Sequence, residues 1–275
     1  AANWYLEDGS VTVNADNSGQ TVTQGSSPAV SDKAPVITQR DSSAETSNTI
    51  TINASEENAT ANVTISDVNI NTSDAAVSTN GKGNVNIELD GTNTLKSSNW
   101  HAGLEKNNDG KLTITDKNEN GKLIATGSRY GAGIGGGNQR NGSNITITGG
   151  EITAIGGYSG AGIGGGLRKE GEKITVSGDA TLKVQGGSGD GWDGAGAGIG
   201  NGGNHNGEFS GSFIPVNAAE TEPDTSNLTT GKIEYYAPGA DMTKDEPTST
   251  ILGSGQPTSP GETAAPVEYR MQTSA

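Results

Sequence analysis

The stretch that decides the fold is Gly131-Ala-Gly-Ile-Gly-Gly-Gly137, which recurs at Gly160–Gly166 and, with one change, at Gly196-Ala-Gly-Ile-Gly-Asn-Gly202. The first two copies lie 29 residues apart, and so do the segments ITITGGEITAIGG (145–157) and ITVSGDATLKVQGG (174–187) that follow them. A fixed period of this length is typical of a repeat protein whose units stack on one another. The alternation of Ile with Thr has a period of two, so each unit is predicted to consist of strands.

The same unit continues toward the N-terminus with less glycine. Its first strand is found at Leu112-Thr-Ile-Thr115, Val85-Asn-Ile87 and Val63-Thr-Ile-Ser66. The coil length is 22 residues from position 63 to 85, then 27 and 33, before it settles at 29. Because the strands keep their pattern while the length varies, insertions are expected in loops at the edges of the coils. We therefore predict an all-β fold, a single-stranded right-handed parallel β-helix over residues 49–207, whose handedness follows the general rule for parallel crossovers.

Two buried ladders are expected to run through the coils, because the stacked strands present alternate side chains to the interior. The first ladder is predicted to contain Val63, Val85, Leu112, Ile145 and Ile174. The second is predicted from the residue that follows Ala-Gly in each repeat: Val77, Leu104, Ile134, Ile163 and Ile199. The Ala and Gly residues beside this second ladder leave room for close packing at a tight corner.

The composition suits a thin solenoid better than a thick globule. Only 29% of the 275 residues are hydrophobic and 4% are aromatic, whereas a compact domain is about half apolar. The net charge of −15 and the scattered Lys and Arg disfavour nucleic acid or an anionic membrane as a partner. There is no cysteine, which is ordinary for a bacterial surface protein, and no apolar run approaches the roughly 20 residues that span a bilayer.

The two ends of the chain differ from the repeats. Residues 1–48 hold short strand-like runs and are predicted to cap the N-terminal end of the helix, because an uncovered edge strand invites aggregation. Residues 208–237 are predicted to form the last rung or a C-terminal cap. Residues 238–275 have the Pro, Ser and Thr content of a linker or tail, with a short strand at 267–269. Since the sequence opens at Ala1-Ala2 without Met, we expect a mature protein or a segment of a larger surface protein.

The combination of ITITGGEITA with GAGIGGG resembles repeat regions of large surface proteins from Gram-positive gut bacteria. Those regions are described as carbohydrate-binding or adhesin-like β-helices with the architecture of pectate lyases. The resemblance covers about residues 45–205 and is specific for the fold rather than for a ligand. It implies display at the cell surface and binding to glycans or host proteins, and it brings no catalytic set that can be placed on this sequence.

The strongest candidate binding feature is a series of aromatic residues. Each of four successive coils places one aromatic residue shortly before its Ala-Gly corner: Trp100, Tyr130, Tyr158 and Trp192. Stacked at the spacing of the coils, these rings would form a strip on which sugar faces can pack. Polar side chains able to bind sugar hydroxyls lie close to them in the sequence: Asn99, His101, Arg129, Asp190 and Asp193. The alternative is an aromatic stack that only covers the glycine-rich corner.

A second candidate is a calcium loop. Asp116, Asn118 and Asn120, followed by Gly121, match the first half of an EF-hand loop, in which oxygens at alternate positions converge on the ion. The acidic residue required at position twelve is absent, because Gly127 stands there. The alternative is a simple turn between two strands. Calcium is the only cofactor that the sequence suggests.

Together these features predict an extracellular, non-enzymatic adhesin or glycan-binding module of a bacterium, whose partner is a glycan or a host glycoprotein. Two alternatives stay open: a polysaccharide lyase or glycoside hydrolase on the same fold, and a surface domain that binds a host protein such as an immunoglobulin or mucin polypeptide. An enzyme would need a converging acid pair or an Asp, calcium and Arg set. No such set is visible, and the only two histidines, His101 and His205, fall in different coils.

Overall fold

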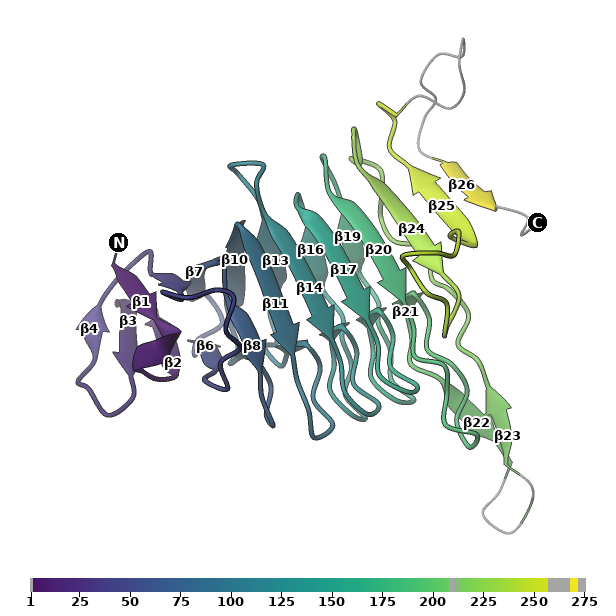
Figure 1. Cartoon of the computed structure of the whole chain (residues 1–275), viewed down its shortest axis with the longest axis horizontal. Helices are drawn as coiled ribbons and strands as arrows, with labels where there is room; N and C mark the ends of the chain where they lie inside the picture. The colour runs from purple at the N-terminus through teal and green to yellow at the C-terminus, as the bar shows by residue number, and fades with distance from the viewer. Residues whose placement is uncertain (1, 208–210, 212, 257–267, 272–275) are drawn as a thin grey trace.

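The computed structural model of the chain is an elongated stack of β-strand coils (Figure 1). It describes residues 2–207, 211, 213–256 and, for the backbone alone, 268–271. In this described part the only helix is the 3-10 turn η1 (Leu6–Asp8), and no helix has the length and apolar character needed to cross a bilayer. The predicted parallel β-helix is confirmed.

Three sheets form the walls of the solenoid. The first contains, in spatial order, β1 (Asn3–Tyr5), β5 (Val36–Thr38), β7 (Thr60–Ser66), β10 (Asn84–Asp90), β13 (Leu112–Thr115), β16 (Ile145–Ile147) and β19 (Ile174–Val176). The second contains β21 (Ile199–Gly200), β18 (Ile163–Gly164), β15 (Ile134–Gly135), β12 (Leu104–Lys106), β9 (Val77–Asn80), β6 (Ile50–Ala54), β2 (Val11–Asp16), β3 (Gly19–Gln24) and β4 (Val30–Ser31). The third contains β26 (Glu268–Met271), β25 (Ser249–Leu252), β24 (Lys232–Tyr236), β20 (Thr181–Gln185), β17 (Glu151–Ile155), β14 (Lys122–Thr126), β11 (Thr92–Lys96) and β8 (Asn69–Asn71).

The ladder predicted after the Ala-Gly corners is confirmed in full. Leu104 lies opposite Val77 and Ile134, and the same register continues through Ile163 to Ile199. All of these side chains are fully buried. The ladder also extends beyond the prediction, because Val77 lies opposite Ile50 and Ile50 opposite Val11.

The other predicted ladder is wrong at one position. Val85 lies opposite Ala61, and Val63 lies opposite Ile87, two residues further along the strand. The rest of the ladder, from Val85 through Leu112 and Ile145 to Ile174, has the predicted register. A shift of two keeps the same side chains inside, so the alternation of Ile and Thr cannot distinguish the two registers.

The ends of the stack are closed by antiparallel strands. At the N-terminal end, β2 pairs in parallel with β6 and antiparallel with β3, which in turn pairs with β4. At the C-terminal end, β24 continues the parallel stack onto β20, while β25 and β26 add antiparallel strands outside it (Figure 1).

The segment predicted as a linker or tail therefore contributes two strands to the third sheet. Its residue Ile251, in β25, is buried in the core. Of the strand predicted at 267–269, position 267 lies outside the described residues, as do 257–266 and 272–275 of the tail and 208–210 and 212 of the predicted last rung. A separate hairpin, β22 (Asn204–Asn206) with β23 (Ile214–Val216), extends from the last glycine-rich coil.

The glycine-rich corner brings neighbouring coils together too closely for a side chain. Gly164 has φ +139°, and a Cβ added there would overlap the carbonyl oxygen of Gly200 in the next coil. The same relation holds between Gly135 and Gly164. These glycines are therefore required by both backbone conformation and space.

Replacing Gly164 with Ala tests this constraint. We expect Gly164→Ala to lower the free energy of unfolding by about 3 kcal/mol, because it combines an unfavourable φ with steric overlap. The matched control is Gly191→Ala, where φ is +91° but no atom lies within 4 Å of the added Cβ. That control should cost only about 1 kcal/mol. Urea unfolding followed by far-UV circular dichroism measures both, and equal losses would show that the corner has room for a side chain.

Candidate functional site

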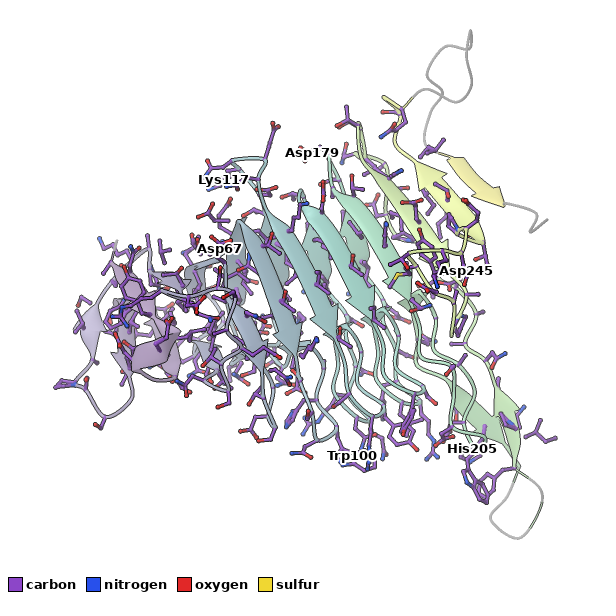
Figure 2. The ribbon with its side chains drawn as sticks, viewed as in Figure 1. Asp67, Trp100, Lys117, Asp179, His205 and Asp245 are labelled. Carbon is purple, nitrogen blue, oxygen red and sulfur yellow. The ribbon has the colours of Figure 1, made fainter. Side chains whose placement is uncertain are left out.

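Three of the four predicted aromatic residues lie side by side at one edge of the solenoid. Trp100, Tyr130 and Tyr158 occupy the turns that lead into β12, β15 and β18. The rings of Trp100 and Tyr130 are stacked with centroids 5.2 Å apart, and those of Tyr130 and Tyr158 meet edge to face at 5.4 Å. Figure 2 shows Trp100 at this edge, on the opposite side of the coils from Lys117 and Asp179. Trp100 and Tyr158 are 44% and 45% exposed, so the row of rings is open to solvent.

The backbone at these aromatic residues adopts a left-handed conformation that favours glycine or asparagine. The φ values are +74° at Trp100, +64° at Tyr130 and +34° at Tyr158. Each residue lies in a tight turn closed by a backbone hydrogen bond, for example from His101 N to Ser98 O at 3.2 Å. A side chain in this region costs about 1 kcal/mol, and such strain clusters at functional sites. Three consecutive coils thus carry an aromatic ring where glycine would be more stable.

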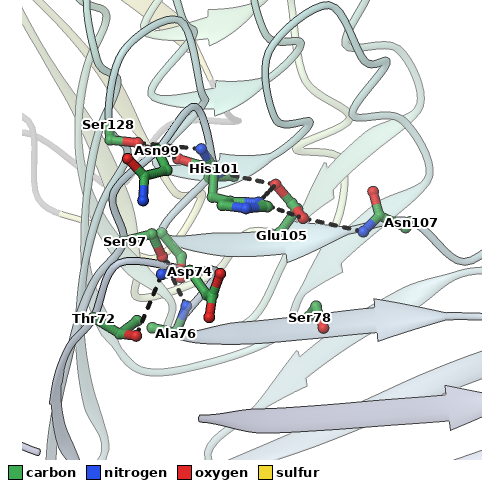
Figure 3. A network of polar contacts seen from close by, with 12 residues as sticks. Thr72, Asp74, Ala76, Ser78, Ser97, Asn99, His101, Glu105, Asn107 and Ser128 are labelled. Atoms are coloured by element: carbon green, nitrogen blue, oxygen red, sulfur yellow. Dashed lines mark hydrogen bonds and ion pairs between the residues drawn. The ribbon is translucent and has the colours of Figure 1, made fainter. Parts of the chain in front are cut away.

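A cavity of about 440 Å³ opens beside the Trp100 ring. Its wall includes His101 and Glu105, whose side chains form a pair with Nδ1 and Oε1 2.9 Å apart (Figure 3). Glu105 is buried and also accepts hydrogen bonds from the Ala102 amide at 3.2 Å and the Asn107 side chain at 3.2 Å. The cavity is completed by Asn99 of the same turn and by three residues from the neighbouring coils, Asn80, Asn138 and Arg140.

One residue of the cavity wall, Asn138, has a buried polar atom without a partner among the described residues. The Oδ1 atom of Asn138 is buried, and no described residue donates a hydrogen bond to it. The backbone of Asn138 is held in place by a bond from its amide to the Trp100 carbonyl oxygen at 2.8 Å. A buried acceptor without a donor costs about 1–3 kcal/mol, so the turn at Asn138 is held beside the cavity at a cost in stability.

The predicted ligand residue Asp190 contacts the aromatic row directly. Its carboxylate accepts a hydrogen bond from the Tyr130 hydroxyl and further bonds from the amides of Trp192 and Asp193 at 2.9 and 2.8 Å. The bond from the hydroxyl to this carboxylate, together with burial, raises the pKa of Tyr130 to about 12. Asp190 thus ties the 188–193 loop to the second ring of the row.

Trp192 lies in a different cluster from the other three aromatic residues. Its ring, 61% exposed, meets Phe213 edge to face at 5.1 Å, and Phe213 in turn contacts His205 at 4.5 Å. The predicted row of four rings is therefore a row of three, and Trp192 packs on the segment that follows the repeats. Neither His205 nor Phe213 follows the repeat period, so no sequence signal pointed to this cluster.

Asp193 is buried beside this second cluster, where its carboxylate binds two side chains. Its buried carboxylate accepts two hydrogen bonds from Arg168, at 2.9 and 3.0 Å, and lies 2.9 Å from Nδ1 of His205. Burial by itself would raise the pKa of the Asp193 carboxyl, but the bonds from Arg168 and His205 outweigh it and hold the pKa below the usual value. Asp193 therefore anchors the loop, while Arg129, next to Tyr130, is exposed to solvent.

The predicted calcium loop folds as a turn closed by its own carboxylate. The two oxygens of Asp116 accept hydrogen bonds from the amides of Asn120 at 3.2 Å and Gly121 at 3.0 Å. The Asn120 side chain donates to Asp90 at 2.7 Å, and Asn118 lies on the outer face of the first sheet. Within the described residues, no group of three or more His, Cys, Asp or Glu is arranged to hold a metal ion. Calcium binding here stays a prediction, and the bonds of Asp116 fit the turn.

The chain matches no protein-family model, and no curated protein or solved structure is significantly similar to it.

The strain at Trp100 can be measured with two substitutions that remove the same ring. Trp100→Ala and Trp100→Gly both lose the stacking on Tyr130, but only Gly relieves the left-handed φ. We expect Trp100→Gly to be more stable than Trp100→Ala by about 1 kcal/mol in urea unfolding. If the Ala variant is as stable as the Gly variant, the turn relaxes freely and the aromatic residue carries no backbone cost.

The Asp193 anchor predicts a pH-dependent contribution to stability. Because its pKa is lower in the folded chain than in the unfolded one, its stabilisation is complete above the unfolded value near ~4 and is lost as the pH falls through the folded value. We expect Asp193→Asn to lower the free energy of unfolding by about 2 kcal/mol at pH 5. The difference from wild type should shrink as the pH is lowered below ~4. A difference that is constant down to pH ~2.5 would contradict an ionised Asp193 anchor.

Proposed function

We propose that the chain is an extracellular, non-enzymatic glycan-binding module of a bacterial surface protein, and that the cavity beside Trp100 is its binding site. The observation that carries this proposal is the exposed Trp100 ring at the border of a cavity lined with amide and charged side chains. A sugar offers the matching chemistry, since it has an apolar face of C–H groups for the ring and hydroxyl groups that donate hydrogen bonds.

The other side chains of the cavity suit the same ligand. Asn80, Asn99 and Asn107 supply amide groups, Glu105 and Arg140 supply charged ones, and His101 adds an imidazole paired with Glu105. Such groups fix the orientation of a ligand through hydrogen bonds while the aromatic ring supplies contact area. The cavity crosses from one coil to the next, so it favours an extended, repeating ligand over a compact one.

A purely structural role for the aromatic row is the competing explanation. Two observations weigh against it: Trp100 and Tyr158 keep nearly half of their surface in solvent, and the backbone is strained beneath all three rings. An aromatic residue that only covers the corner would be favoured to bury its ring. A turn without a binding role would be favoured to have glycine at this position. Retention of exposed rings at a cost in stability supports a function outside the fold itself.

A glycan array, followed by calorimetry on its hits, tests the proposal. We expect Trp100→Ala to weaken binding of the hits at least tenfold, a loss of about 1.4 kcal/mol. The matched control is Trp192→Ala, which removes an equally large exposed ring from the Phe213 cluster and should change the affinity less than twofold.

Two results would contradict the proposal. If Trp100→Ala binds every hit with unchanged affinity, the cavity is not the binding site. If the wild-type chain releases reducing ends or unsaturated sugars from a hit, the module is an enzyme of the lyase or hydrolase class. Binding of a deglycosylated host polypeptide in place of any glycan would support the host-protein alternative.

A further inference from the structure

A second cavity of about 530 Å³ continues the Trp100 cavity along the solenoid. The two share Asn107 and Arg140 in their walls, so they form one groove that crosses successive coils. The second cavity is further lined by Lys106 and Asp109 of one coil and by Glu172 and Lys173 two coils further on. Its charged groups are thus three cations and two carboxylates, in a chain whose net charge is −15.

Lys106 has an unusual place for a lysine. It lies opposite Thr79 in the register of β12 with β9, and Thr79 lies opposite Ile52 of β6, so Lys106 holds the same inward-facing position as these two residues. Thr79 and Ile52 are fully buried there, and Lys106 is only 6% exposed. The next coil provides no strand residue opposite Lys106, because β15 has two residues where β12 has three. The backbone of the next coil bends away after β15, so the space beside Lys106 is not filled and forms part of the cavity.

The Lys106 amine lacks the partner that burial of a charge requires. It donates a hydrogen bond to the Asn108 carbonyl oxygen at 2.6 Å, and no carboxylate of the described residues lies within 4 Å of it. Burial lowers the pKa of Lys106 to about 8, and the more distant Asp109 offsets this only in part. Buried charges in proteins are paired or bind an ion, and buried lysine is rare without such a partner.

The support beneath Lys106 is rigid. The buried Asn108 side chain donates to the carbonyl oxygens of Gly83 at 3.0 Å and Lys111 at 3.3 Å, and it accepts a bond from the Thr79 hydroxyl at 2.6 Å. The carbonyl oxygen that holds the Lys106 amine is therefore fixed in position. A preformed site of this kind needs little reorganisation to accept a ligand group.

We infer that the second cavity is an anion subsite, in which Lys106, Arg140 and Lys173 bind a negatively charged group carried by the ligand. The inference rests on the proposed function and narrows it: the ligand is an acidic glycan, with one sugar on the Trp100 ring and a carboxylate or sulfate group in the neighbouring cavity. Arg140 lines both cavities and so contacts both parts of the ligand. An anion beside the amine supplies the missing counter-charge.

The subsite has a pH signature. An anion binds the protonated amine, so its affinity should be constant below pH 8 and fall by up to tenfold per pH unit above it, until the pKa of the complex is reached. The charged groups that face the amine across the cavity are Asp109, Arg140, Glu172 and Lys173. Lys106→Met removes the amine and leaves these four groups in place, so loss of the transition in that variant assigns it to Lys106.

The experiment compares matched oligosaccharides that differ only in charge. The probes are a sialylated trisaccharide, the same trisaccharide with its carboxyl group reduced to an alcohol, and this reduced trisaccharide carrying one sulfate ester. We expect one of the charged probes to bind at least tenfold more tightly than the reduced probe, and the choice between them identifies carboxylate or sulfate. Lys106→Met should abolish this preference and the transition near pH 8 while leaving the affinity for the reduced probe unchanged. The matched control, Lys169→Met, removes an exposed lysine from a neighbouring loop and should change neither.

A second measurement does not depend on glycan binding. The lysine side chains can be followed by NMR while N-acetylneuraminate or inorganic sulfate is added at constant ionic strength, and the Lys106 pKa should rise toward the ordinary lysine value. Equal binding of charged and reduced probes, with no change at Lys106, would overturn the anion subsite and leave the glycan proposal intact. Binding of neither probe, with a rise of the Lys106 pKa, would overturn the glycan proposal and keep the anion site.

Discussion

The close approach of backbones at the glycine-rich corner is the constraint on which the rest of the structure depends. Successive coils meet there with no space for a Cβ, and Gly135, Gly164 and Gly200 fill the position in three consecutive coils. This contact fixes the register of the second sheet, and the Ile ladder beside it buries the apolar surface that holds the coils together. Because the register is fixed, the turns before the corner are superimposed, and their side chains form a continuous surface.

The sequence predicts most of the scaffold because the scaffold is periodic. The ladder from Val77 to Ile199 could be placed residue by residue, since Ala and Gly mark the corner in each coil. The position of Val63 could not, because a strand that alternates without such a marker can shift by two residues and still bury the same face. The strands of the terminal segments, such as β25, do not follow the repeat. They are identified only in the structure, from their packing on the last coil.

The candidate site likewise contains residues that the repeat predicts and residues that it does not. Trp100, Tyr130 and Tyr158 precede the corner by two or three residues, so their neighbourhood follows from the register. Trp192 precedes it in a longer loop, which reaches out to Phe213 and leaves the row. The partners of Asp193 come from a loop 25 residues away and from β22, 12 residues away, and their side-chain geometry has no periodic signature. Sequence thus predicts positions that the repeat enforces, while contacts between irregular loops require the three-dimensional structure.

Both cavities occur where the repeat changes character. The coil that contains β12 has an ordinary strand at the corner, whereas the coil of β15 is the first with the full glycine-rich corner and a two-residue strand. At this junction one side chain, Glu105, lies where the following coils have only glycine, and another, Lys106, points inward with no residue stacked on it. A uniform solenoid would close each coil on the next and offer a flat surface. The mismatch between the two kinds of coil creates the groove. Charged side chains can line this groove because the buried interior of the solenoid ends at the junction between the two coils.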